Sequence, residues 1–241
     1  YYASRGLGDV YKRQLYAKGC AVRDSSRTGF KDAIETARNA DAVVMVMGGS
    51  SARDFSSEYE ETGAAKVTIN QISDMESGEG YDRATLHLMG RQLELLEEIS
   101  RLGKPVVLVL IKGRPLLMEG AIQEAEAIVD AWYPGMQGGN AVADVLFGDY
   151  NPAGRLTLSV PRSVGQLPVY YNTRRKGNRS RYIEEPGTPR YPFGYGLSYT
   201  TFSYTDMKVQ VTEGSDDCRV DVTVTIQNQG TCLLYTSPSP R

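Results

Sequence analysis

The chain has 241 residues, with 27 basic and 29 acidic side chains, one histidine and a formal net charge of −2. A slightly acidic balance argues against nucleic acid or an anionic membrane surface as a partner. No apolar run approaches the length of a membrane span. Neither the charge nor the hydropathy of the chain therefore favours a nucleic-acid or membrane partner.

The two ends of the chain differ in pattern from everything between them. One DNA string that encodes residues 4–14 has a reverse complement that, read one base out of frame, encodes residues 232–241. Such an inverted repeat resembles translated adapter sequence from library preparation, the alternative being two unrelated natural tails. We therefore interpret residues 1–14 and 232–241 as artefacts and exclude them from fold reasoning.

On this interpretation the protein proper spans residues 15–231 and is truncated at both ends, so the lack of a visible signal peptide carries no information on location. It keeps 23 basic and 28 acidic residues, a formal charge of −5. Its two cysteines, Cys20 and Cys218, are far apart and predict neither a disulfide framework nor a zinc site. We expect no cofactor and no metal.

Residues 15–161 alternate between predicted helices and strands. Helical spacing of apolar residues covers 30–37 and 84–103, and two further helices are predicted at 116–127 and 138–148. Near-continuous apolar runs predict buried strands at 41–49, 104–111 and 127–133, while the alternation in 155–160 indicates an edge strand. This alternation of helices and strands predicts an α/β domain with a doubly wound, mostly parallel sheet and helices on both faces.

Two residues that occur once in the sequence, His87 and Trp132, are interpreted as structural rather than functional. His87, the lone histidine, falls in the leucine-rich stretch 84–103 and is interpreted as an ordinary helix residue, which argues against a Ser-His or Cys-His triad. Trp132 ends a predicted buried strand, so we interpret it as a core residue rather than a platform for a sugar ring.

The composition changes after residue 161. Residues 162–199 are rich in Pro, Gly, Arg and Tyr and have no periodicity, which is typical of an extended linker. Residues 200–231 alternate and predict antiparallel strands of a second, all-β domain of the Ig or fibronectin-III-like kind. Because such a sandwich needs about seven strands, this truncated segment cannot form a closed one.

The motif "SGEGYDR", residues 77–83, places Glu79 alone between two glycines. A dinucleotide-binding loop would need a third glycine where Arg83 stands, and it would follow a strand directly. A plain turn, with Asp82 capping the next helix, is the simplest interpretation. A catalytic one is also open, because flanking glycines let the backbone bring a carboxyl group close to a ligand.

Five stretches in one order resemble glycoside hydrolase family 3, of the β-glucosidase and β-xylosidase type. They are "VVMVMGGSSARDFSSEYEETG", "SGEGYDR" with "LMGRQLELL", "GKPVVLVLIKGRPL", "YPGMQGGNAVADVLFGDYNPAGRLTLSVP" and "YPFGYGLSYTTFSY". The resemblance implies a three-domain enzyme: a barrel, an α/β sandwich domain and often a fibronectin-III-like domain. This chain would hold the second domain and the start of the third, while the barrel, with an aspartate nucleophile, would be missing.

By this resemblance Glu79 matches the family's acid/base glutamate, with Glu76 as the main rival and Glu58, Glu60 and Glu61 as remoter candidates. A retaining glycosidase pairs such an acid/base with a second carboxyl group about 5–5.5 Å away. Possible substrate-binding residues are Arg53, Asp54, Asp82 and Arg83. For Arg53 and Asp54 a solvated loop is the simpler interpretation, and for Asp82 and Arg83 an ion pair or a cap that positions the loop.

The function expected from the resemblance is hydrolysis of terminal β-linked glucose or xylose with retained configuration, the isolated fragment being inactive. Its partners would be a β-linked oligosaccharide or glycoside and the missing barrel of the same chain, with no nucleic acid and no membrane. The location expected by resemblance is the periplasm or the outside of a bacterial cell. The alternative is a non-catalytic carbohydrate-binding or interaction module.

Overall fold

The computed structural model of this chain describes residues 14–52, 60–63, 74–78, 81–172, 182–213 and 218–232. The candidate residues Arg53, Asp54, Glu58 and Glu79 lie outside the described residues. The chain forms two compact units, one of Tyr1–Val142 with Thr157–Phe193 and one of Ala143–Leu156 with Gly194–Arg241. Each unit is described by itself.

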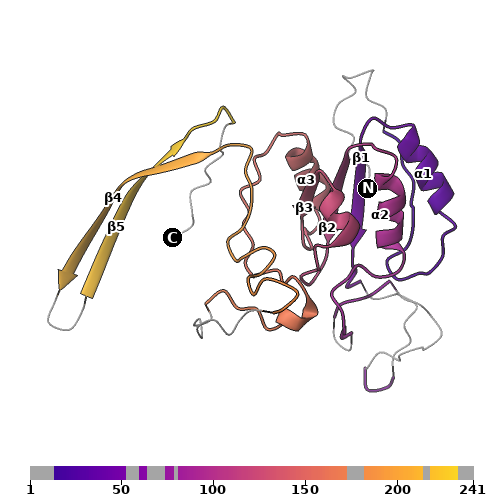
Figure 1. Cartoon of the computed structure of the whole chain (residues 1–241), viewed down its shortest axis with the longest axis horizontal. Coiled ribbons are helices and arrows are strands. Elements are labelled where there is room, and N and C mark those ends of the chain that lie inside the picture. Colours follow the sequence, from indigo (N-terminus) through magenta and orange to yellow (C-terminus); the bar gives the residue numbers. More distant parts are fainter. Residues whose placement is uncertain are drawn as a thin grey trace. The chain divides into compact units, whose positions relative to one another are not determined.

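The first unit is built on a parallel sheet of three strands in the order β1-β2-β3 (Figure 1): Val43–Gly48, Val106–Ile111 and Ala127–Asp130. Val43 lies opposite Val106 and Gly48 opposite Ile111. The central strand β2 is the most buried, as expected for a parallel strand with neighbours on both sides. The predicted α/β class is confirmed, although Val44 and Val46 of β1 are exposed.

Two helices of the first unit, α1 (Phe30–Arg38) and α2 (Gln92–Ser100), lie beside each other next to β1 (Figure 1). Their buried faces carry small and apolar side chains at helical spacing, together with one polar residue: Phe30, Ala33, Ala37, Gln92, Leu95, Leu96 and Ile99. None of the described helices is long and apolar enough to cross a membrane.

The helix predicted for 84–103 is shorter than expected, because α2 begins only at Gln92. Gly90 has a φ of +62°, and a Cβ at this position would lie 2.7 Å from the carbonyl oxygen of Val22. Gly90 therefore packs closely against the backbone of residues 22–24, in a left-handed conformation that interrupts a helix. His87 lies in this non-helical part, so its interpretation as a helix residue was wrong.

Two other predicted elements differ from the structure. The helix predicted for 116–127 is reduced to a short 3₁₀ turn, Gly120–Glu124, because Leu117 N–H bonds laterally to the carbonyl of Leu86 at 2.9 Å. The edge strand predicted for 155–160 is not formed; only Val160 makes an isolated antiparallel bridge, to Tyr191. By contrast, the predicted helix at 138–148 is confirmed as α3, Gly138–Leu146.

Gln166 organises the described part of the segment predicted as an extended linker. Its side chain is buried, accepts a bond from the N–H of Arg162 at 2.7 Å and donates to the carbonyl of Pro186 at 2.9 Å. A 3₁₀ turn, Val164–Gln166, brings this side chain into place. The described parts of this segment, 162–172 and 182–199, thus contain no regular strand but have fixed internal hydrogen bonds, which periodicity cannot reveal.

The second unit contains the antiparallel pair β4 (Phe202–Glu213) and β5 (Cys218–Asn228). The register shifts between Thr205 and Lys208, where Asp206 has a φ of +54°. The antiparallel strands predicted after residue 200 are therefore present as a hairpin. Their large apolar side chains are exposed, as expected of two strands without a second sheet: Val209, Val211, Val220, Val222, Val224 and Ile226.

Candidate functional site

The motif around Glu79 lies where β1 ends. Met75 forms a parallel bridge with Ser50, and the N–H of Glu76 donates to the carbonyl of Ser50 at 2.8 Å. The chain that leaves β1 at Gly49 thus returns to the same strand end before it enters the motif. Ligands of open α/β sheets gather at the carboxyl ends of strands, so this is a suitable place for a site.

Glu76 is buried in an ion-pair cluster. Its side chain is 2% exposed, and its Oε2 accepts a bond from Nη1 of Arg83 at 2.8 Å and lies 3.8 Å from Nε of Arg114. The side chain of Arg83 is itself 8% exposed. A buried carboxylate with these partners holds protein segments together, because breaking such a pair leaves an uncompensated buried charge.

Gly49 leaves room for the carboxylate of Glu76. A Cβ at Gly49 would lie 2.0 Å from Oε1 of Glu76, so no other residue fits without a shift of the acid. Within the described part of the chain this Oε1 has no hydrogen-bond partner. Spacing along the sequence does not connect Gly49 with an acid 27 residues later.

Gln92, at the start of α2, fixes the last residue of β1. Its Oε1 accepts a bond from the N–H of Gly48 at 2.8 Å, and its Nε2 donates to the carbonyl of Gly48 at 2.9 Å. The side chain is 3% exposed. A single buried amide therefore satisfies both backbone groups where the strand ladder stops.

The segment 77–81, here called the 77–81 loop, is held from two other strand ends. Nη2 of Arg114, which follows β2, donates to the carbonyls of Glu76 at 3.2 Å and Tyr81 at 3.0 Å. The hydroxyl of Tyr133, which follows β3, lies 2.8 Å from Oγ of Ser77.

Gly113 permits this arrangement, because a Cβ there would lie 2.6 Å from the ring of Tyr133 and 3.0 Å from Oγ of Ser77. The close approach of the two hydroxyl-bearing side chains thus depends on the glycine between Lys112 and Arg114. Lys112, Gly113 and Arg114 all fall in the stretch "IKGRPL", but spacing alone does not connect them with a loop more than thirty residues earlier.

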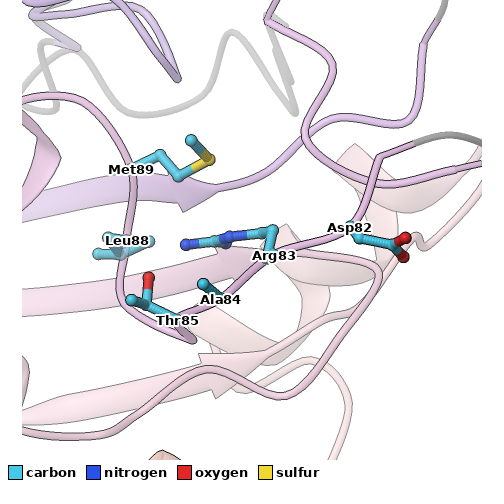
Figure 2. Close-up of a pocket in the computed structure, with 6 residues that line it drawn as sticks. All are labelled: Asp82, Arg83, Ala84, Thr85, Leu88 and Met89. Carbon is cyan, nitrogen blue, oxygen red and sulfur yellow. The ribbon is translucent and has the colours of Figure 1, made fainter.

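Arg83 forms its ion pair with Glu76 rather than with Asp82, and it also donates to the carbonyl of His87. Figure 2 shows the guanidinium of Arg83 directed toward Leu88, whereas Asp82 points the opposite way. Asp82 is exposed and does not cap α2, whose N-cap position is Arg91. The expected ion pair or cap between these neighbours is therefore not formed.

A hollow of about 380 Å³ lies against this segment, lined by Asp82, Arg83, Ala84, Thr85, Leu88 and Met89 (Figure 2). Two other candidates, Glu60 and Glu61, are exposed in a turn closed by a bond from Gly63 N–H to Glu60 O. His87 pairs with Glu119 at 2.8 Å, both about half exposed.

Lys112 forms a second buried charge cluster that the sequence did not indicate. Its side chain is fully buried, with Nζ 2.9 Å from Oδ1 of Asp130 and 3.7 Å from the ring centre of Trp132. Burial lowers the pKa of Lys112, and the nearby Asp130 carboxylate opposes this shift. Trp132 thus covers a buried cation, with its backbone at a φ of +51°.

A family model and several known proteins match most of this chain. The model of the glycosyl hydrolase family 3 C-terminal domain matches residues 5–199. The chain belongs to glycosyl hydrolase family 3. It is 42% identical to a β-xylosidase of Formosa agariphila over 218 residues, and 41% identical to a periplasmic β-glucosidase of Salmonella typhimurium over 227 residues.

These matches cover 89% and 90% of this chain but only 27% of each family 3 relative, so the chain spans about a quarter of their length. Among solved structures, a β-glucosidase from Erythrobacter marinus matches with a TM-score of 0.66 at 39% identity. That match covers 85% of this chain and 25% of the other. The resemblance inferred from the five ordered motifs is thereby confirmed.

Proposed function

We propose that this chain is part of a retaining, exo-acting β-glycosidase and that it supplies the acid/base carboxylate, Glu79. Membership of glycosyl hydrolase family 3 carries the proposal. The nucleophile, an aspartate, would belong to an N-terminal barrel of the same protein. The names of the relatives support a terminal β-linked glucose or xylose as the sugar removed.

The geometry of Glu76 supports Glu79 over its rival. An acid/base must reach the glycosidic oxygen and exchange a proton with it. Glu76 is 2% exposed and held by Arg83 and Arg114, so it cannot approach a substrate without leaving both partners. Glu60 and Glu61 lie in an exposed turn for which no such contacts are found among the described residues.

Four further residues were candidates for substrate contact. Because the guanidinium of Arg83 is engaged with Glu76, we assign it to holding the loop rather than to binding the sugar. Asp82 is exposed beside the hollow and remains a candidate for sugar contact, as do Arg53 and Asp54 in the segment that follows β1. A periplasmic or secreted location is proposed on the name of the Salmonella relative.

The deciding experiment uses the complete enzyme with Glu79→Gln. Loss of the acid should lower turnover of substrates with poor leaving groups far more than that of activated aryl glycosides, since the latter need little protonation. Azide should restore turnover of the activated substrates by replacing the water that Glu79 activates. Equal loss on both classes without azide rescue would refute the assignment.

The 241-residue chain assayed alone should have no glycosidase activity, because it lacks the proposed nucleophile. Measurable turnover of an aryl glucoside or aryl xyloside by this chain would contradict the division of carboxylates between two domains.

A further inference from the structure

Gly78 and Tyr81, which flank Glu79 and Gly80 in the sequence, are joined by a hydrogen bond. The N–H of Tyr81 donates to the carbonyl of Gly78 at 3.1 Å. On the other side, Ser77 and Glu76 bond through their N–H groups to the carbonyl of Ser50 at 3.4 and 2.8 Å. The 77–81 loop is therefore short and tied at both ends.

Arg114 is the side chain that connects both ends of this loop. One nitrogen, Nη2, donates to Glu76 O and Tyr81 O, while Nε faces the buried carboxylate of Glu76. The side chain of Arg114 is 23% exposed, so these bonds form in a partly water-excluded place. A guanidinium has several donors in a rigid fork, which suits such multiple contacts better than a lysine ammonium would.

Tyr133 provides a second, independent attachment, at Ser77. It comes from the end of β3, whereas Arg114 comes from the end of β2. The loop is thus attached to residues that follow two neighbouring parallel strands, which are rigid elements of the core. Placing a reacting group on such supports is what catalytic geometry requires, because a displacement of about 1 Å can cost about 100-fold in rate.

We infer that Arg114 and Tyr133 are positioning residues that set the location of Glu79 by holding the two ends of the 77–81 loop. This inference rests on the proposed function of Glu79. Neither residue takes part in proton transfer; each acts through the backbone or through Ser77. Removal of either contact lets the loop shift while the acid itself is retained.

The first test measures the loop directly in the 241-residue chain, by hydrogen–deuterium exchange followed by mass spectrometry. Arg114→Met should speed amide exchange in residues 76–82 at least 10-fold and leave the peptide of α2 unchanged. Arg101→Met is the matched control, since that arginine is 65% exposed and pairs only on the surface of α2. Unchanged exchange in residues 76–82 would overturn the inference.

The second test measures the consequence in the complete enzyme. Arg114→Met should lower kcat about 10- to 100-fold on glycosides with poor leaving groups and much less on activated aryl glycosides, with KM little changed. A merely structural role would reduce the active fraction and so lower turnover of both classes by one factor. That equal loss would overturn the positioning role.

Tyr133→Phe keeps the test decisive if Arg114→Met fails to fold, because it removes only the hydroxyl that faces Ser77. It should give a smaller loss with the same dependence on the leaving group. A loss shared equally by both substrate classes, or no loss, would remove Tyr133 from the inference. Glu79→Gln run in parallel separates the two proposals: if it shows no leaving-group dependence, the assignment of Glu79 fails, whatever the loop exchange shows.

Discussion

The carboxylate of Glu76 and the guanidinium of Arg83 lie 2.8 Å apart and are almost completely shielded from water, at 2% and 8% exposure. Glu76 lies three residues before Glu79, and the pair connects the residue just before the motif with the last residue of the motif. Its energetic role follows from burial, since a paired buried charge becomes a large penalty once its partner is neutralised.

Glu76→Gln should therefore destabilise the first unit by about 3–5 kcal/mol, as measured for buried pairs that lose one partner. Equilibrium unfolding in urea, followed by the fluorescence of the single tryptophan, Trp132, gives the free energy. Glu97→Gln is the control, because that side chain is 50% exposed in a surface pair with Arg101; its effect should stay below about 1 kcal/mol. Equal effects of the two variants would contradict a structural role for the buried pair.

Gly49→Ala should destabilise by about 1–3 kcal/mol, because the new methyl group overlaps the carboxylate of Glu76. In a Glu76→Ala background the same change should cost little, since the space beside Gly49 is then empty. Gly154→Ala serves as the control, with no atom within 4 Å of its Cβ position. A penalty that persists in the Glu76→Ala background would show that the clash is not its cause.

Gln92→Leu should be more destabilising than an ordinary polar-to-apolar exchange, because it leaves the N–H and the carbonyl of Gly48 without partners. Each unsatisfied buried group costs about 1–3 kcal/mol. Gln92→Glu retains an acceptor for the N–H but sets a buried, unpaired carboxylate against the carbonyl, so thermal unfolding should show it to be no more stable than the leucine variant. The exposed change Gln137→Leu should have almost no effect.

Lys112 makes stability depend on pH in the alkaline range. Burial lowers its pKa in the folded chain below the usual 10.5, while the unfolded chain keeps the usual value. Between the two values the unfolded state binds more protons, so this group makes the folded state more stable as pH rises. Below the lowered pKa the lysine is charged in both states, and the full cost of burying the cation is present.

Lys112→Met removes this titration from both states. Denaturant unfolding of parent and variant from pH 7 to 10.5 should therefore show a free-energy difference that changes with pH in favour of the parent. All other ionisable groups are common to both proteins, so their contributions cancel in the difference. A difference that is constant over this range would contradict the lowered pKa.

The sequence predicted the elements that depend on local pattern. Apolar runs identified β1, β2 and β3, and helical spacing identified α1 and α3. The helix predicted from the sequence was longer than α2, because the pattern of apolar residues does not reveal the backbone contact of Gly90 with Val22. The helix expected at 116–127 failed for the same reason: Leu116, Leu117 and Met118 are buried in an extended segment bonded to Leu86, not along a helix face.

The candidate site could be predicted as a place on the chain but not as a set of contacts. The glycines around Glu79 drew attention to the right loop, and the ordered motifs named the family. The partners of Glu76 are 7 and 38 residues away, so only the folded chain brings them together. Arg114, Tyr133 and Gln92 were missed because their side chains bind backbone atoms or a serine, and such bonds leave no spacing signature.

The double contact of Gln92 with Gly48 makes α2 an extension of the strand end. The side-chain amide of Gln92 bonds to Gly48 as the peptide group of a neighbouring strand would, although it belongs to α2. If α2 slid along its axis, Gln92 would displace Gly48. The displacement would then reach Gly49 and the carboxylate of Glu76, which packs against Gly49. We therefore expect the start of α2 and the end of β1 to move together.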